Sequence, residues 1–220
     1  MRGALDRVLD LLFPPKCPFC GRVLDRPGLC PACEKALPWT GEREGLRTLS
    51  GGLRCAAPLW YEDPARAGVL RFKFQGASGA ARALGPLVAQ CAAERFSGEF
   101  DVVTWVPVSR RRLRKRGYDQ AELLARAACR VWDAEPAALL RKTVHNAAQS
   151  TVQEAAARRA NVLGVYELRP GAAAAGRHIL LIDDICTTGA TLSECARVLR
   201  DAGAAEVVCA ALALTREQKA

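Results

Sequence analysis

The sequence predicts an α/β fold, in which a parallel-sheet core with flanking helices is preceded by a small four-cysteine module. From about residue 65 onwards, apolar β-branched segments alternate with helix-like segments, which is typical of a parallel sheet. Four cysteines stand in two closely spaced pairs near the N-terminus. With 220 residues, 50% of them hydrophobic, the chain can hold one sizeable domain and a small appendage. We therefore expect an N-terminal helix and metal module over residues 1–60 and an α/β domain over residues 61–220.

The first segment, "MRGALDRVLDLLFPP", is interpreted as an amphipathic helix. Its apolar residues lie on one helical face: Leu5, Val8, Leu9 and Leu12. Asp6 and Asp10 interrupt the apolar pattern, which argues against a secretory signal. We expect a cytoplasmic protein with reduced thiols, whose first helix docks on the protein itself or touches the inner face of a membrane. The net charge of +9 favours an anionic partner, either a nucleotide, a phosphosugar or a nucleic acid.

The cysteine pairs "CPFC" and "CPAC" have the spacing of metal ligands. Cys17, Cys20, Cys30 and Cys33 offer four soft thiolates, which favour a closed, structural zinc site. Gly21 permits the tight turn after the first pair. The alternatives are two unrelated cysteine pairs or redox disulfides.

The segments after the module are predicted from glycine positions and apolar periodicity. Glycines break any long helix between residues 41 and 52, so hairpin-like strands are expected around residues 46–61. The remaining elements follow in this order: helices over 65–76 and 78–96, a strand over 100–108, a helix over 118–133, strands over 138–143 and 178–185, a helix over 191–202 stopped by Gly203, and a strand over 206–214.

The stretch "HILLIDDICTTGATL" combines a buried strand, two adjacent carboxylates and a hydroxyl-rich loop. The loop lies between a strand and a helix, so its N–H groups can surround a phosphate at the positive end of the helix dipole. It lacks the Gly-Lys-Ser/Thr of a Walker loop and the glycines of a dinucleotide fingerprint. Asp183 and Asp184 can accept hydrogen bonds from a sugar beside that phosphate. A ribose 5-phosphate satisfies both demands.

The run from Ile179 to Thr191 resembles the phosphoribosyl-pyrophosphate (PRPP) signature of type I phosphoribosyltransferases, with Cys186 standing where a larger apolar residue is usual. The resemblance implies that Asp183 and Asp184, as the catalytic carboxylates, accept hydrogen bonds from the ribose hydroxyls. It assigns the 5-phosphate to Thr187, Thr188, Gly189, Ala190 and Thr191. It assigns the pyrophosphate to a loop after the first core strand, which is Val108, Ser109 and Arg110 here. Magnesium is expected to bridge pyrophosphate and ribose oxygens.

Three further segments resemble the ComF family and the related GntX-like group, and the resemblance extends over essentially the whole chain. They are "LRFKFQG", "VPVSRRRLRKRGYDQAELLA" and "KTVHNAAQSTVQEAAARRANVLGVY", the last matching through Gln149, Arg158, Asn161, Gly164 and Tyr166. The resemblance implies a type I phosphoribosyltransferase fold over residues 61–220, behind a four-cysteine module. It also implies a competence protein tied to DNA uptake, with single-stranded DNA and a DNA-uptake helicase as partners. GntX-like proteins are instead attributed to carbohydrate utilisation.

A basic cluster, "RRRLRKR", is expected in a loop at the carboxyl end of the strand predicted over residues 100–108. The hydroxyl-rich loop begins at the carboxyl end of the strand predicted over residues 178–185, so the two loops are expected to converge on one crevice. The six cations of the basic cluster exceed what one pyrophosphate needs. A solvated face or a pyrophosphate cradle is one interpretation, and contact with single-stranded DNA is the other. Under the second interpretation the DNA contacts come from Arg111, Arg112, Arg114, Lys115 and Arg116, with Tyr118 stacking on an unpaired base. Lys73, between two phenylalanines, is either a cation aimed at the phosphates or a lysine on a packed surface.

The sequence therefore predicts a PRPP-binding, magnesium-dependent competence factor that handles single-stranded DNA. An active phosphoribosyltransferase with an unknown acceptor and a PRPP-sensing regulator without turnover remain alternatives. The sequence does not determine the oligomeric state.

Overall fold

The computed structural model describes residues 14–41, 44–74, 78–143 and 164–216. The predicted N-terminal helix lies outside these residues. The helices are α2 (Pro31–Ala36), α3 (Ala65–Phe74), α4 (Ala81–Arg95), α5 (Arg110–Arg116), α6 (Gln120–Cys129) and α8 (Ala190–Asp201), with short 3-10 turns η1 (Ser50–Gly52), η2 (Ser78–Ala80) and η3 (Arg130–Trp132). The strands are β1 (Leu46–Thr48), β2 (Arg54–Ala56), β3 (Leu59–Trp60), β4 (Val102–Trp105), β5 (Leu140–Lys142), β6 (Tyr166–Leu168), β7 (His178–Cys186) and β8 (Glu206–Leu214).

The main sheet has six strands in the order β1-β2-β8-β7-β4, and β3 also pairs with β8. All pairs are parallel except β1 with β2, so the predicted parallel core is confirmed. The register aligns Leu181 with Thr104 of β4 on one side and with Cys209 of β8 on the other. The carboxyl ends of β4 and β7 therefore meet at one edge of the sheet.

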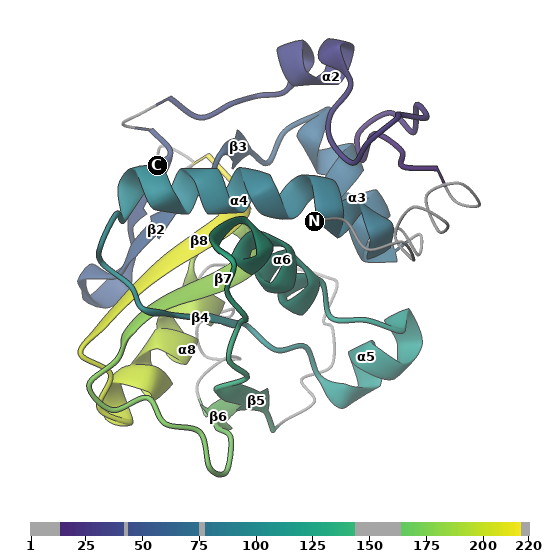
Figure 1. The fold of residues 1–220 in the computed structure, drawn as a ribbon. Helices are drawn as coiled ribbons and strands as arrows, with labels where there is room; N and C mark the ends of the chain where they lie inside the picture. Colours follow the sequence, from purple (N-terminus) through teal and green to yellow (C-terminus); the bar gives the residue numbers. More distant parts are fainter. Residues whose placement is uncertain (1–13, 42–43, 75–77, 144–163, 217–220) are drawn as a thin grey trace, which may run out of the picture.

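The central strand β7 is buried on both faces, as its unbroken apolar run requires. Leu180 and Ile182 face a core covered by α4 and α6, and Ile179 and Leu181 face a second core covered by α8. Figure 1 shows α4 and α6 across one face of the sheet and α8 across the other. The α4–α6 pair packs closely, since a Cβ on Gly85 would lie 2.3 Å from Ala127 Cβ.

The segment that follows the cysteine module belongs to the main sheet. Strands β1 and β2 form the expected hairpin around η1, but β2 and β3 also pair with β8. The sheet thus includes residues on both sides of the domain boundary predicted between residues 60 and 61.

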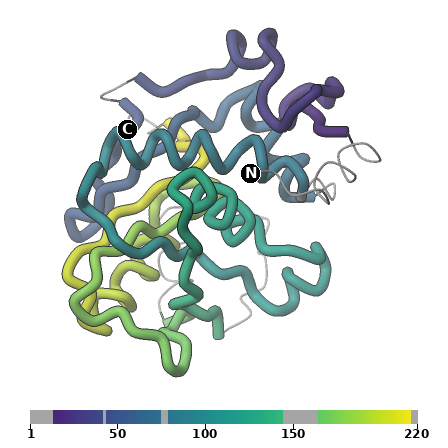
Figure 2. The backbone as a smooth tube through the Cα atoms, viewed as in Figure 1, coloured from purple at the N-terminus to yellow at the C-terminus, as the bar shows by residue number. Residues whose placement is uncertain are grey.

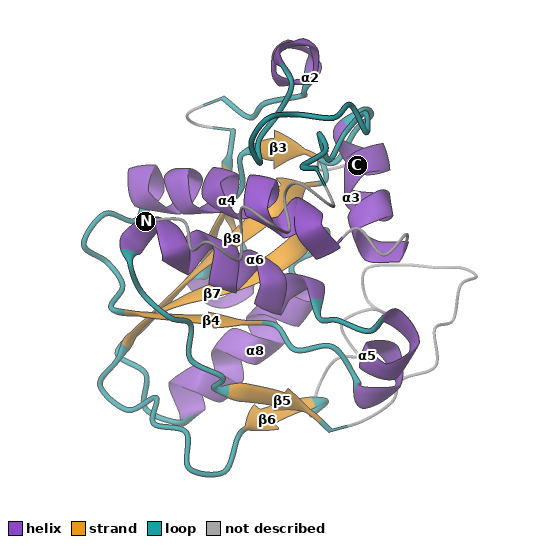
Figure 3. Ribbon diagram, turned by 45° about the vertical axis from the view of Figure 1, so that its right-hand side comes forward, coloured by secondary structure: helices purple, strands orange, loops and turns teal. Residues whose placement is uncertain are grey.

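Two other local features differ from the sequence prediction. Strand β5 joins no parallel pair and instead forms a separate antiparallel sheet with β6, which is visible below the main sheet in Figure 3. The basic stretch after β4, expected as a loop, is the helix α5. Among the described residues, no helix has the length and apolar character needed to cross a membrane.

Candidate functional site

The two carboxylates predicted to bind a sugar lie at the carboxyl end of β7. The backbone N–H of Asp184 donates to Asp183 Oδ1 over 2.7 Å. Burial, and next the neighbouring Asp184, raise the pKa of Asp183 above its usual range, against the opposing charge of Lys73. This edge of the sheet therefore needs a cation or hydrogen-bond donors, and α3 supplies one cation.

Lys73 forms an ion pair with Asp184, with 3.0 Å between Nζ and Oδ2. The two side chains are only 19% and 13% exposed, so water screens the pair weakly. Lys73 belongs to the last turn of α3, within the helix predicted over residues 65–76. Its backbone carbonyl accepts from Gln120 Nε2 at 3.4 Å, and that of Phe72 accepts from the Tyr118 hydroxyl at 2.6 Å. Lys73 is thereby held beside the carboxylates.

The hydroxyl-rich loop connects β7 to α8. Gly189 has a φ of +74° and precedes the first residue of α8, Ala190, whose N–H donates to Thr188 Oγ1 over 3.4 Å. The Thr187 carbonyl accepts from Arg47 Nη1 at 2.9 Å and from Thr215 Oγ1 at 3.4 Å. The loop leads into a 12-residue helix, whose N-terminus is the end of the helix dipole that favours an anion.

Leu49, a buried residue of the β1–β2 hairpin, packs against the β7–α8 loop at Gly189. A Cβ on Gly189 would lie 2.5 Å from Leu49 Cδ2 and 2.7 Å from Leu49 Cδ1. Leu49 precedes η1, and only 8% of it is exposed. Gly189 is therefore required by its backbone angle and by its neighbour, in addition to any approach of a ligand.

The second loop follows β4. The Val106 N–H donates to Ile182 O over 3.0 Å, so this loop leaves the sheet directly beside the carboxylates. Ser109 caps α5 by accepting from Arg112 N at 3.3 Å. The two predicted loops therefore lie at one edge of the sheet, as the parallel arrangement requires.

Asp119, which was not among the predicted site residues, holds the second loop in place. Its Oδ2 accepts from Val108 N at 2.9 Å, and its Oδ1 accepts from Ala121 N and Glu122 N at 3.1 and 3.3 Å. Burial raises the pKa of Asp119 to about 6, despite these three donors. The helix-start pattern Asp-x-x-Glu, at residues 119 and 122, was the signal that marks such a cap.

Helix α5 displays the basic cluster to solvent. All its residues except Arg116 are exposed. Arg116 donates to Gln120 Oε1 over 2.7 Å, and its guanidinium carbon lies 4.7 Å from the centroid of the Phe74 ring. Burial lowers the pKa of Arg116. The cluster is thus a helical surface anchored at one end on α3 and α6.

The exposed aromatic side chain beside the cluster is Phe74, with 63% of its surface exposed. Tyr118, the residue expected to stack on a base, donates its hydroxyl to Phe72 O, and its ring centroid lies 6.4 Å from that of Phe72. Phe74 is preceded directly by Lys73. The Phe74 ring contacts Arg116 of the basic cluster, and the neighbouring residue Lys73 contacts Asp184, so these two residues lie between the basic cluster and the carboxylates.

The small sheet β5–β6 contributes a lysine–tyrosine pair. Lys142 Nζ donates to the Tyr166 hydroxyl over 3.1 Å and lies 4.8 Å from the ring centroid. Burial lowers the pKa of Lys142, and Arg112 lowers it further. Nearby, Gly164 N donates to Glu194 Oε1 of α8 over 2.8 Å. Gln149, Arg158 and Asn161, which carried part of the resemblance, lie outside the described residues.

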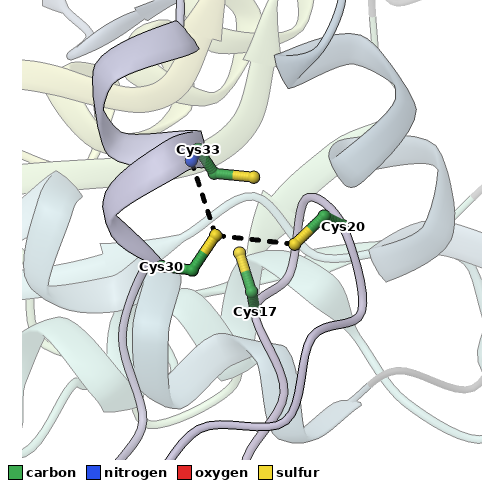
Figure 4. Close-up of side chains that lie close together, drawn as sticks. All are labelled: Cys17, Cys20, Cys30 and Cys33. Carbon is green, nitrogen blue, oxygen red and sulfur yellow. Dashed lines mark hydrogen bonds between the residues drawn. The ribbon is translucent and has the colours of Figure 1, made fainter.

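The four cysteines of the N-terminal module converge, as Figure 4 shows. Their sulfur atoms all lie within 4.8 Å of one another, and Cys20 Sγ is 3.6 Å from Cys30 Sγ. Zn–S bonds of about 2.3 Å in a tetrahedron give sulfur separations of about 3.8 Å, so the group fits zinc. The Cys33 N–H, donating to Cys30 Sγ over 3.4 Å, is the main cause that lowers the pKa of Cys30 to about 7. Gly21 adopts a φ of +79° after the first pair, as predicted.

Two family models match the chain. Residues 113–220 match the phosphoribosyl transferase domain, and residues 8–44 match the double zinc ribbon domain. The zinc-ribbon match and the cysteine geometry together support a structural zinc site.

The similarity to known proteins extends over most of the chain. The DNA utilization protein YhgH of Escherichia coli O157:H7 is 31% identical over 201 residues, which cover 87% of this chain and 80% of that protein. Competence protein ComFC of Bacillus subtilis is 30% identical over 194 residues, covering 87% of this chain and 74% of that protein. Among solved structures, the glutamine PRPP amidotransferase from B. subtilis aligns with a TM-score of 0.45 and 21% identity, over 66% of this chain and 30% of that one.

Proposed function

Because the chain belongs to the ComF family of competence-associated proteins with a phosphoribosyltransferase domain, we propose that it binds PRPP with magnesium and handles incoming single-stranded DNA in natural transformation. The observation that carries the first part is the carboxylate pair on β7 with Lys73 beside it and the β7–α8 loop directly after it. These groups supply acceptors for a sugar and a cradle for an anion within one short segment.

In the proposed complex, Asp183 and Asp184 accept hydrogen bonds from the ribose hydroxyls. The 5-phosphate lies against Thr187–Thr191, where N–H groups and the dipole of α8 favour a dianion. The pyrophosphate lies against Val108–Arg110. Magnesium, when bound with PRPP, neutralises the pyrophosphate oxygens. The protein's own contribution is to hold the ribose in a fixed orientation and to match its charges.

The DNA part of the proposal rests on α5 and on the neighbouring aromatic ring. Exposed arginine and lysine side chains suit a phosphate backbone, and an exposed ring offers a stacking surface for an unpaired base. The guanidinium carbon of Arg116 lies 4.7 Å from the centroid of the Phe74 ring, and 63% of the Phe74 side chain remains exposed. We assign base stacking to Phe74, because Tyr118 is engaged with Phe72.

An active transferase with an unknown acceptor and a PRPP-sensing regulator would use the same carboxylates and loop. Release of pyrophosphate in the presence of candidate acceptors separates the transferase from the other two. Salt-dependent binding of single-stranded DNA separates the competence factor from the regulator. A four-thiolate zinc site and reduced cysteines suit the cytoplasm, where we place the protein.

Calorimetric titration with PRPP and magnesium tests the ligand assignment. Asp184→Asn removes a charged acceptor, and such hydrogen bonds contribute about 1.5–3 kcal/mol, so PRPP affinity should fall by roughly 10- to 100-fold. The matched control is Asp101→Asn, an exposed carboxylate that pairs with Arg177 at the opposite end of β4. Unchanged affinity in the first variant, or equal losses in both, would contradict the assignment.

A further inference from the structure

The cysteine module contacts α3 through one aromatic side chain. Phe19 lies between the ligands Cys17 and Cys20 and is 4% exposed. A Cβ on Gly68, in the middle of α3, would lie 2.3 Å from Phe19 Cδ1 and 2.7 Å from Phe19 Cε1. A glycine inside a helix is unfavourable relative to alanine. Gly68 therefore serves the close approach of the Phe19 ring to the helix backbone.

A hydrogen bond and a shared core reinforce this contact. Arg71 of α3 donates from Nη2 to the Phe19 carbonyl. Cys17 and Phe19 belong to the same hydrophobic core as Val69 and Phe72 of α3. Figure 2 shows the backbone of the module at one end of the molecule, close to α3. The module is therefore attached to the helix that carries Lys73.

Helix α3 is held from two directions. The module contacts it at Gly68 and Arg71, and the α5–α6 segment holds its last carbonyls through Tyr118 and Gln120. Lys73 lies two residues beyond Arg71, and its Nζ is 3.0 Å from Asp184 Oδ2. A change at the contact between the module and α3 would move the backbone that places this cation.

We propose that Phe19 is a positioning residue for the ligand site: the zinc-bound cysteine pair holds its ring against Gly68, and this contact sets α3 so that Lys73 reaches Asp184. The consequence for PRPP rests on the proposed function, whereas the effect on the Lys73–Asp184 pair does not. Zinc then has a role beyond the stability of its own module, because it fixes the Cys17–Cys20 turn that contains Phe19.

The first experiment measures Lys73 directly and needs no ligand. Trace acetylation followed by peptide mass spectrometry gives the reactivity of Lys73 relative to exposed Lys115. In Phe19→Ala, Lys73 should react several-fold faster than in the wild type, and Phe19→Leu should restore part of the protection. Val23→Ala is the matched control, since Val23 is a 56% exposed residue of the same module. Unchanged Lys73 reactivity in zinc-loaded Phe19→Ala would overturn the proposal.

The second experiment is a double-mutant cycle on PRPP affinity. Phe19→Ala should weaken PRPP binding by about tenfold, and the same change should have little effect in a Lys73→Ala background, because contacting residues couple. A general loss of structure would weaken binding equally in both backgrounds, which would also overturn the proposal. If Phe19→Ala does not retain zinc, Gly68→Ala replaces it, since its methyl group displaces the same ring. Wild-type protein that binds no PRPP would refute the proposed function, and Lys73 reactivity would still decide the positioning role.

Discussion

Replacing Gly189 by alanine should destabilise the protein through two separate effects that the structure identifies. An alanine at φ = +74° incurs a strain of about 1–2 kcal/mol. Its methyl group would also lie 2.5 Å from Leu49 Cδ2, and overpacking of this kind costs about 1–3 kcal/mol. The reduced entropy of the unfolded chain offsets about 0.4–1 kcal/mol of this. The free energy of unfolding should therefore fall by roughly 1–4.5 kcal/mol.

The Leu49→Ala background separates the two effects. Leu49→Ala alone should cost about 2–5 kcal/mol, because it leaves a cavity under the loop. In the double variant the new methyl group occupies part of that space, so the two changes should cost about 1–3 kcal/mol less together than separately. The strain of the left-handed residue remains, because it is independent of the neighbour.

Urea denaturation of the wild type, both single variants and the double variant measures these terms. Calorimetry with PRPP should show weaker binding in Gly189→Ala, since the loop must shift where the 5-phosphate is proposed to bind. A cost below about 1 kcal/mol for Gly189→Ala, or strictly additive costs, would refute the packing argument.

Three further predictions concern other parts of the molecule. Purified wild-type protein should contain one zinc per chain by elemental analysis, and Cys17→Ser should lose it; wild-type protein without stoichiometric metal would contradict the site. The pKa of Asp119 is about 6 in the folded protein, against an ordinary value of 3.8. Between these two pH values the folded state binds more protons than the unfolded state, so the protein becomes less stable as the pH rises. Relative to Asp119→Asn, the wild-type free energy of unfolding should fall by about 2–3 kcal/mol between pH 3 and pH 7 in urea titrations; a flat difference would contradict the raised pKa. The double variant Arg114→Ala with Lys115→Ala should bind labelled oligo-dT more weakly and reduce the log–log salt slope by about 1.4, with PRPP affinity nearly unchanged. Collapse of PRPP affinity at a wild-type salt slope would instead assign the cluster to the pyrophosphate.

Local patterns predicted the elements whose structure depends on neighbouring residues in the chain. Strand β7 and its loop were predictable because the apolar run, the carboxylates and the hydroxyl-rich turn are contiguous. The cysteine pairs were predictable because their spacing alone allows a tetrahedral site. By the same reasoning, the parallel sheet followed from alternating segments, and the meeting of two loops at one edge followed from the sheet.

Contacts between distant segments were not predictable. Lys73 and Asp184 are far apart in sequence, and nothing near Lys73 indicates which carboxylate it meets. Leu49 under Gly189 is a similar case, since a glycine in such a loop suggested a ligand and not a leucine. Helix α5 was missed because six cations around Leu113 show no apolar periodicity, although Ser109 before it and Gly117 after it are typical helix boundaries.

The order of strands in the sheet has a consequence for biosynthesis. In the part of the chain that the structure describes, every parallel pair includes β7 or β8, which are the last two strands to be synthesised. The β1–β2 hairpin and the α4–α6 pair can form while translation continues, but β4 must wait for β7, and β2 and β3 must wait for β8. In a nascent chain, β4 thus has no parallel partner until β7 is complete at Cys186, and β2 and β3 have none until β8 is complete at Leu214. Apolar strands are therefore exposed to aggregation and to chaperones for much of the synthesis.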